Sequence, residues 1–238
     1  MPSFFSSIFF VLLLLSTAFS RQLPAVKQPD LTPQTTTIKI NEIMKAHATY
    51  KELNPVLIKR ILQNYLENLD PVKTYFIETD IHQWLEPSDK LLDQIEQEYK
   101  HSDFHTFELI HEAMASAIER RHTLEKQIDM SQLPKRVKPE EFKDMKWANT
   151  EQELLTRLTR IKALQIETAS KLNEETKEKS LQRMAKRQTK YEDDILTTDP
   201  VERQRLILVE VLKATASSLD SHSSYFTPDE ATQYMINV

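Results

Sequence analysis

The chain has 238 residues, of which 39% are hydrophobic and 28% are charged, and its formal net charge is −5. A chain of this size can form one large domain or two small ones, and its acidic balance argues against nucleic acid or an anionic membrane surface as a partner. The sequence contains no glycine and no cysteine. Without cysteine, the protein cannot have disulfides, thiolate metal sites or a cysteine nucleophile.

The absence of glycine is the most informative feature of the composition, because average usage is about 7%. Phosphate-binding loops, dinucleotide-binding fingerprints, nucleophile elbows and most tight β-hairpins rely on glycine at positive φ angles. Helices joined by Pro, Asn, Asp and Ser turns tolerate its absence best. The composition therefore predicts an all-α protein, an irregular bundle of many helices.

The first 20 residues have the features of a targeting segment. Residues 4–19 are mostly apolar, and Ala18 and Ser20 are small residues at the two positions that a signal peptidase reads before a cut at Arg21. We expect residues 1–20 to be a signal peptide that exports the chain and leaves no stable membrane insertion after cleavage. An uncleaved anchor is the alternative, although a spanning helix needs about 20 apolar residues.

Amphipathic helices are predicted along most of the remaining chain. Residues 21–37 carry three prolines and few apolar side chains, which predicts an extended leader. From residue 38 to residue 130, apolar residues recur at three- and four-residue spacing, and caps and prolines mark where each helix begins and ends. The expected helices start at residue 38 and then cover residues 54–69, 80–85, 88–100 and 104–128.

A proline and three basic residues make residues 131–138 the predicted linker between two helical halves, residues 38–130 and 139–238. The second half is expected to open with a helix from Pro139 to Trp147.

Three more helical segments are expected in the second half. One helix opens at Thr150, which begins a capping box with Glu153. Residues 171–194 are rich in charge but keep an apolar stripe, which predicts a long, thinly buried helical arm, with a helical hairpin as the alternative. A last apolar helix starts at Asp199 and Pro200.

Two segments, residues 69–80 and 219–230, share one pattern: Leu-Asp, four further residues, Tyr-Phe, and then polar residues that can start a helix. Each is predicted to be a helix–turn–helix joint, in which the acid begins a turn and the aromatic pair anchors the connection on the core. In the second copy, Thr227 and Glu230 form a capping box around Pro228. Such a joint is either a packed corner without chemistry or a hinge or docking corner.

The histidines give weak signals for metal binding or catalysis. His101 and His105 have the spacing of a metal pair on one helix, but Asp103 breaks the predicted helix between them. His111 is followed by Glu112, yet the position for a second metal-binding histidine holds an alanine. His222 is interpreted as a turn residue. We therefore predict no metal site.

Other polar clusters are interpreted as structural, because no sequence motif places a base or an oxyanion hole near them. The serines at 217, 218, 221, 223 and 224 are turn-type residues, and the pairs Glu140/Glu141 and Asp193/Asp194 diverge on a helix surface. The basic residues of the arm alternate with acids, which is typical of an ion-paired surface. They are Lys177, Lys179, Arg183, Lys186, Arg187 and Lys190. The residues alone predict no catalytic, cofactor-binding or metal site.

The two joints resemble the N-terminal helical domain of bacterial tail-specific proteases, the carboxyl-terminal processing serine peptidases. That family has an early LDP…YF…D unit and a later LDPHTSYF(S/T)P unit ahead of a PDZ domain. Here the units are Leu69-Asp70-Pro71…Tyr75-Phe76…Asp80 and Leu219-Asp220-Ser221-His222-Ser223-Ser224-Tyr225-Phe226-Thr227-Pro228. Ser221 replaces the family's proline, and the resemblance extends over residues 38–238.

The resemblance implies a periplasmic, non-catalytic domain, because the family's PDZ domain and Ser/Lys dyad have no counterpart in this chain. We expect a fragment that ends where a PDZ domain would begin. Such a domain scaffolds contacts with protein substrates, with an adaptor protein, or with another subunit in a homo-oligomer. The alternative is a stand-alone exported helical adaptor or chaperone-like protein without enzymatic activity.

Overall fold

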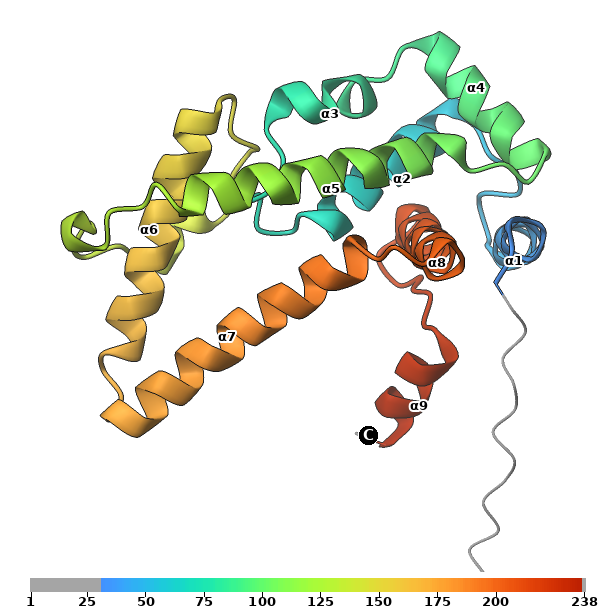
Figure 1. Ribbon diagram of the computed structural model, residues 1–238. Coiled ribbons are helices and arrows are strands. Elements are labelled where there is room, and N and C mark those ends of the chain that lie inside the picture. Colours follow the sequence, from blue (N-terminus) through green and yellow to red (C-terminus); the bar gives the residue numbers. More distant parts are fainter. Residues whose placement is uncertain (1–30, 237–238) are drawn as a thin grey trace, which may run out of the picture.

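The computed structural model describes residues 31–236, and this part of the protein contains nine α-helices, two short 3-10 helices (η1 and η2) and no strand (Figure 1). The predicted all-α class is therefore confirmed. The predicted signal peptide and residues 21–30 of the predicted leader lie outside the described residues. The elements are α1 (Pro33–Ala46), α2 (Pro55–Leu69), α3 (Glu78–Leu85), α4 (Asp89–Lys100), α5 (His105–Glu125), η1 (Met130–Gln132), η2 (Pro139–Phe142), α6 (Glu151–Ala169), α7 (Glu174–Ile195), α8 (Pro200–Leu219) and α9 (Pro228–Ile236).

Helix α2 lies at the centre of the core and packs against α8, α4 and α3. Its apolar stripe is completely buried, including Leu57, Ile61 and Leu66, and α8 adds Val211 and Leu212 from the other end of the chain. Burial of each such side chain stabilises the fold by roughly 1.5–3 kcal/mol. One hydrophobic cluster thus joins residues from both sides of the predicted linker at 131–138.

The charged arm predicted at residues 171–194 is the single helix α7, and the alternative of a hairpin within those residues is wrong. Helix α7 instead forms a hairpin with the preceding helix, α6. The two helices pack against each other and meet at a turn away from the core, as Figure 1 shows at lower left. Only two residues of α7, Glu192 and Ile195, are buried, and both lie at the end that returns to the core. A small cluster that includes Leu124, Leu154 and Leu158 packs the other helix of the hairpin, α6, against α5.

Side-chain caps fix the helix starts as the sequence predicts. Asn54, Ser88, Thr150 and Asp199 each accept a hydrogen bond from a backbone N–H in the first turn of the helix that follows. Each such cap typically contributes about 1 kcal/mol.

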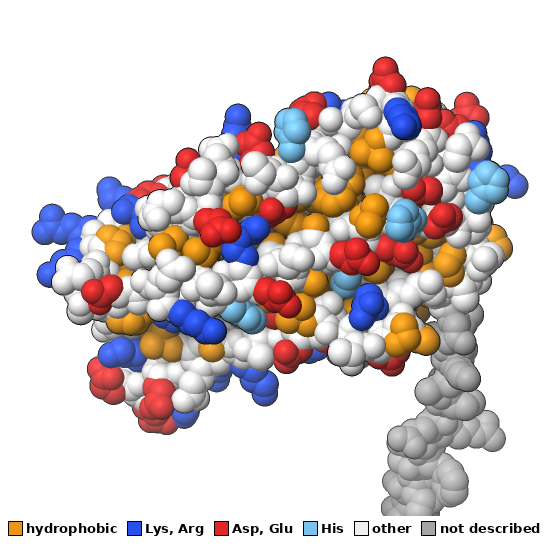
Figure 2. Space-filling model, turned by 45° about the horizontal axis from the view of Figure 1, so that its top comes forward, with side chains coloured by type: hydrophobic (Ala, Val, Ile, Leu, Met, Phe, Trp, Pro, Cys, Tyr) orange, Lys and Arg blue, Asp and Glu red, His pale blue; other side chains and the backbone are white. Residues whose placement is uncertain are grey.

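On the surface, basic and acidic side chains are interspersed with hydrophobic ones over the face that Figure 2 shows.

Three expectations about helix bounds are wrong. Helix α1 begins at Pro33, so residues 33–37 are helical and not extended, because Thr32 caps the helix and accepts from the backbone N–H of Thr35. Only residues 139–142 of the expected helix from Pro139 to Trp147 are helical. Helix α5 ends at Glu125, before residue 128.

Positive φ angles occur even though the chain has no glycine to favour them. They are found at Lys73, Ser102, Arg136 and Asp144. A non-glycine residue in this conformation costs roughly 1–2 kcal/mol, which the surrounding contacts must offset. Asp144 interrupts the segment that was expected to be helical up to Trp147. Beyond it, the chain is not helical before α6, and Ala148 forms a parallel bridge with Ile77.

Candidate docking site at the two joints

The first joint, residues 69–80, is organised by a carboxyl group in the core. Asp70 is completely buried, and its side chain accepts hydrogen bonds from the backbone N–H groups of Thr74 at 2.7 Å and of Tyr75 and Phe76 at 3.1 Å. The indole N–H of Trp147 donates to the same carboxyl group at 3.0 Å. Four donors therefore converge on one side chain, as a buried carboxyl group requires.

Arginine side chains satisfy the carbonyl and hydroxyl groups on the outside of this turn. Arg157 donates to the carbonyl of Lys73 at 2.5 Å, Arg120 to that of Tyr75 at 2.9 Å, and Arg121 to the hydroxyl of Thr74 at 2.9 Å. These contacts hold the backbone in place around Lys73, whose φ is 52°. The joint is thus fixed from inside by a carboxyl group and from outside by three guanidinium groups.

The end of α7 is fastened to the first joint by a second polar network. The hydroxyl of Tyr75 donates to Glu192 at 2.9 Å, His122 lies 2.8 Å from the other carboxyl oxygen, and Tyr191 donates to the carbonyl of Leu69. Burial raises the pKa of Glu192, but hydrogen bonds from His122, Gln188 and Tyr75 outweigh it, so that the net pKa is below the usual range. The hairpin is therefore anchored at its base.

The second joint, residues 219–230, has the same pattern but lies at the surface. Asp220 is exposed, and it accepts from the backbone N–H groups of His222 and Ser223, both at 2.7 Å. His47, at the end of α1, lies 2.8 Å from its other oxygen. These hydrogen bonds, that of His222 first, lower the pKa of Asp220 to about 2. Phe226 is 50% exposed, whereas the equivalent Phe76 is completely buried.

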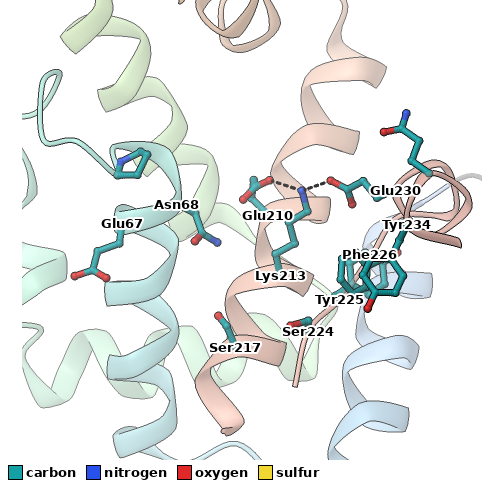
Figure 3. A pocket seen from close by; sticks show the side chains of 12 residues that line it. Glu67, Asn68, Glu210, Lys213, Ser217, Ser224, Tyr225, Phe226, Glu230 and Tyr234 are labelled. Atoms are coloured by element: carbon teal, nitrogen blue, oxygen red, sulfur yellow. Dashed lines mark hydrogen bonds and ion pairs between the residues drawn. The ribbon is translucent and has the colours of Figure 1, made fainter. Parts of the chain in front are cut away.

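A groove of about 730 Å³ lies beside the second joint, between α2, α8 and α9. Figure 3 shows Lys213 of α8 between two carboxylates, those of Glu210 at 3.3 Å and Glu230 at 2.8 Å. Burial lowers the pKa of Lys213, but the two carboxylates raise it by more, so that the net pKa is above the usual value of a lysine. We call this the second-joint groove; its charged lining residues are Glu67, Glu210, Lys213 and Glu230.

A groove of about 540 Å³ lies beside the first joint and is bounded by that joint, η2, α6 and α7. Apolar side chains dominate it, and its two charged lining residues, Arg121 and Arg187, are both cations. We call it the first-joint groove. The two grooves therefore carry opposite charge.

Comparison with protein families gives a match over residues 39–229, to the family described as the tail specific protease N-terminal domain. The chain belongs to this family. Both joints lie wholly or almost wholly within the matched residues, with only Glu230 of the second joint outside them. Comparison with curated proteins gave no match.

The candidate histidines of this tail-specific protease domain each contact a different partner. His101 bonds the carbonyl of Gln97 at 2.8 Å, whereas His105 lies 3.6 Å from Glu108. His111 is buried and its ring N–H donates to the carbonyl of Ile195 at 3.0 Å; burial lowers the pKa of its ring. Residues 31–236 contain no cluster of three or more side chains able to hold a metal ion.

The other candidate residues of the domain lie in local contacts. Ser217 and Ser218 both accept hydrogen bonds from Asn64, and the serines at 221, 223 and 224 lie in the second joint. Glu141 pairs with Arg160. On α7, the pairs Lys177–Glu174, Lys179–Glu175 and Lys190–Asp194 are ion pairs within the helix.

Sequence reasoning missed the residues that complete the first joint, above all Trp147 and Arg157. Both are distant from Asp70 in sequence, and no local pattern marks a tryptophan or an arginine for such a role.

No described helix is long and apolar enough to cross a membrane.

Proposed function

We propose that this chain is the non-catalytic N-terminal helical domain of a periplasmic tail-specific serine protease, and that it scaffolds contacts with protein substrates, an adaptor or another subunit. The observation that carries the proposal is the family match over residues 39–229, which includes almost all of both joints. Catalysis would then belong to other parts of the protease.

The geometry supports a scaffolding role. The first joint binds together segments that are far apart in sequence, since Asp70, Trp147 and Glu192 all belong to its hydrogen-bond network. Two open grooves of opposite charge flank this frame. A rigid frame with open grooves is suited to present contact surfaces at fixed positions.

The periplasmic location rests on the signal-peptide features of residues 1–20. The alternative function, a stand-alone exported helical adaptor, is favoured by one observation. Helix α8 packs on α1 and α2, so that one hydrophobic cluster spans the domain from α1 to α8.

The size of the native product separates these two functions. An antibody against residues 171–194 should detect, in the periplasmic fraction of source cells, a band well above 27.9 kDa. A single band at or just below 27.9 kDa would contradict the protease assignment and favour the stand-alone adaptor. As a second test, the purified chain should leave an unfolded protein substrate intact under conditions in which the larger product degrades it.

A further inference from the structure

The first-joint groove has an apolar floor that the chain itself leaves uncovered. Phe142 of η2, Ile161 and Leu164 of α6, and Met184 of α7 line it. Val72 of the first joint also lines it and is 62% exposed, although Asp70 and residues 74–76 of the same joint are buried. Its volume of about 540 Å³ lies within the range of ligand-binding sites.

The charged groups of this groove select the charge of its occupant. Arg121 is buried and is held by Glu125 and Thr74. Arg187 is exposed, and no carboxylate within the described residues pairs with it. An apolar groove with an unpaired guanidinium group favours an apolar segment that carries a carboxylate.

Polar side chains at the groove favour a peptide over a fatty acid. Asn68 and Gln165 line the groove, and the described residues offer neither amide a hydrogen-bond partner. A peptide backbone that enters an apolar groove needs such partners for its N–H and C=O groups, whereas a hydrocarbon chain does not.

The backbone of the first joint also determines which kind of carboxylate can bind. Successive backbone N–H groups could capture the carboxyl terminus of a peptide. Here the N–H groups of Thr74, Tyr75 and Phe76 already donate to Asp70. The backbone of the joint therefore offers no site for a terminal carboxylate, and we assign the carboxylate of the occupant to an acidic side chain that reaches Arg187.

We propose that the first-joint groove docks an apolar peptide segment of a partner protein, with an acidic side chain of that segment paired to Arg187. The proposal rests on the proposed function, since it names the chemistry of a partner that the scaffold holds. It does not depend on a free carboxyl terminus in the partner.

Fluorescence anisotropy with the full chain tests the docking. The probe is a labelled, acetylated and amidated peptide of Leu and Ala that contains one Glu. Arg187→Glu should weaken its binding roughly tenfold, because attraction becomes repulsion, and Arg187→Lys should retain most of it. Val72→Asp should also weaken binding roughly tenfold, because it removes apolar contact and adds a like charge.

Two matched variants control for charge and surface change. Lys186→Glu makes the same charge reversal on α7 one residue away, about 100° around the helix and outside the groove. Val201→Asp changes a valine that is 76% exposed and does not line the groove. Both should bind the probe as the unmodified chain does. Circular dichroism should show the same helix content in all variants.

Replacing the Glu of the peptide with Gln completes the test. The Gln peptide should bind the unmodified chain roughly tenfold more weakly, and Arg187→Glu should then have little further effect, since the two changes remove the same contact.

Three results would overturn the proposal. The first is that the Glu peptide does not bind at concentrations up to about 1 mM. The second is that all the groove variants still bind it as the unmodified chain does. The third is that palmitate, or a peptide whose only carboxylate is its terminus, binds more tightly than the Glu peptide. If the docking test fails and the native product has the size of a protease, only the docking proposal for the first-joint groove is rejected. Binding as expected with a native product of 27.9 kDa or less would reject the protease assignment alone.

Discussion

The two joints share a sequence pattern but differ in what surrounds them. In the first joint, Asp70 and Phe76 are completely buried, and Trp147 reaches Asp70 from a distant part of the chain. In the second, Asp220 is exposed and Phe226 is half exposed. Asp70 accepts hydrogen bonds from backbone N–H groups four to six residues ahead, whereas Asp220 accepts from those two and three residues ahead, so the two turns also differ.

The difference shows that the shared sequence pattern determines neither the hydrogen bonds of the turn nor its burial. The first joint lies between α2, α5, α6 and α7. Helices α5 and α6 supply the arginines and α7 supplies the glutamate that satisfy its polar groups. The second joint contacts the end of α1 through His47. One copy has therefore become part of the core, while the other remains at the surface beside an acidic groove.

Truncation of the second aromatic residue of each pattern should give the largest contrast. Phe76→Ala removes a completely buried ring and should lower the free energy of unfolding by about 3–5 kcal/mol. Phe226→Ala should change it by less than about 1 kcal/mol, because half of that ring is already in water. Urea unfolding of both variants measures the contrast. Equal losses would mean that the second joint is as well packed as the first.

Neutralisation of the two aspartates should give the next largest contrast. Asp70→Asn keeps the shape but turns one acceptor oxygen into a donor that faces backbone N–H groups, which should cost about 3 kcal/mol. For a chain of this size, that lowers the melting temperature by roughly 6–12 °C. Asp220→Asn should lower it far less, because water can replace the lost bonds. Thermal unfolding followed by circular dichroism compares them, and a larger loss for Asp220→Asn would refute the assignment of roles.

The smallest expected effect is the pH dependence at the second joint. Asp220 should titrate with a pKa of about 2, below the usual value of about 3.9. Because the pKa is lower in the folded state, the carboxylate stabilises the fold above its usual pKa, and this contribution is lost as the pH falls from about 5 toward 2. The carboxyl carbon signal in an NMR titration measures the pKa directly. His47→Ala should raise that pKa, and an unchanged value would show that the backbone N–H groups alone set it.

The sequence predicted the helices well but not the contacts between distant segments. Caps such as Asn54 and Asp199 are local signals, and they mark true helix starts. The cap at Thr32 was missed because the residue at its capping-box position is Thr35, in place of the usual Glu or Gln.

The segment from Pro139 to Trp147 shows why the contacts between distant segments could not be predicted from the sequence. Its composition favours a helix, but its far end is pinned by contacts with the first joint. The carbonyl of Ala148 accepts from the backbone N–H of Glu78 at 2.8 Å, and Trp147 donates to Asp70. Long-range pairing overrides local preference here. The same contact supplies one of the four donors to the buried carboxyl group of Asp70.

Hydrogen exchange followed by mass spectrometry or NMR tests most directly the claim that the first joint belongs to the core and the second to the surface. The amides of Thr74, Tyr75 and Phe76 should exchange as slowly as those of α2, and at least on the order of 100-fold more slowly, after correction for intrinsic rates, than those of His222 and Ser223. Equal protection of the two joints, or faster exchange at the first, would contradict the account.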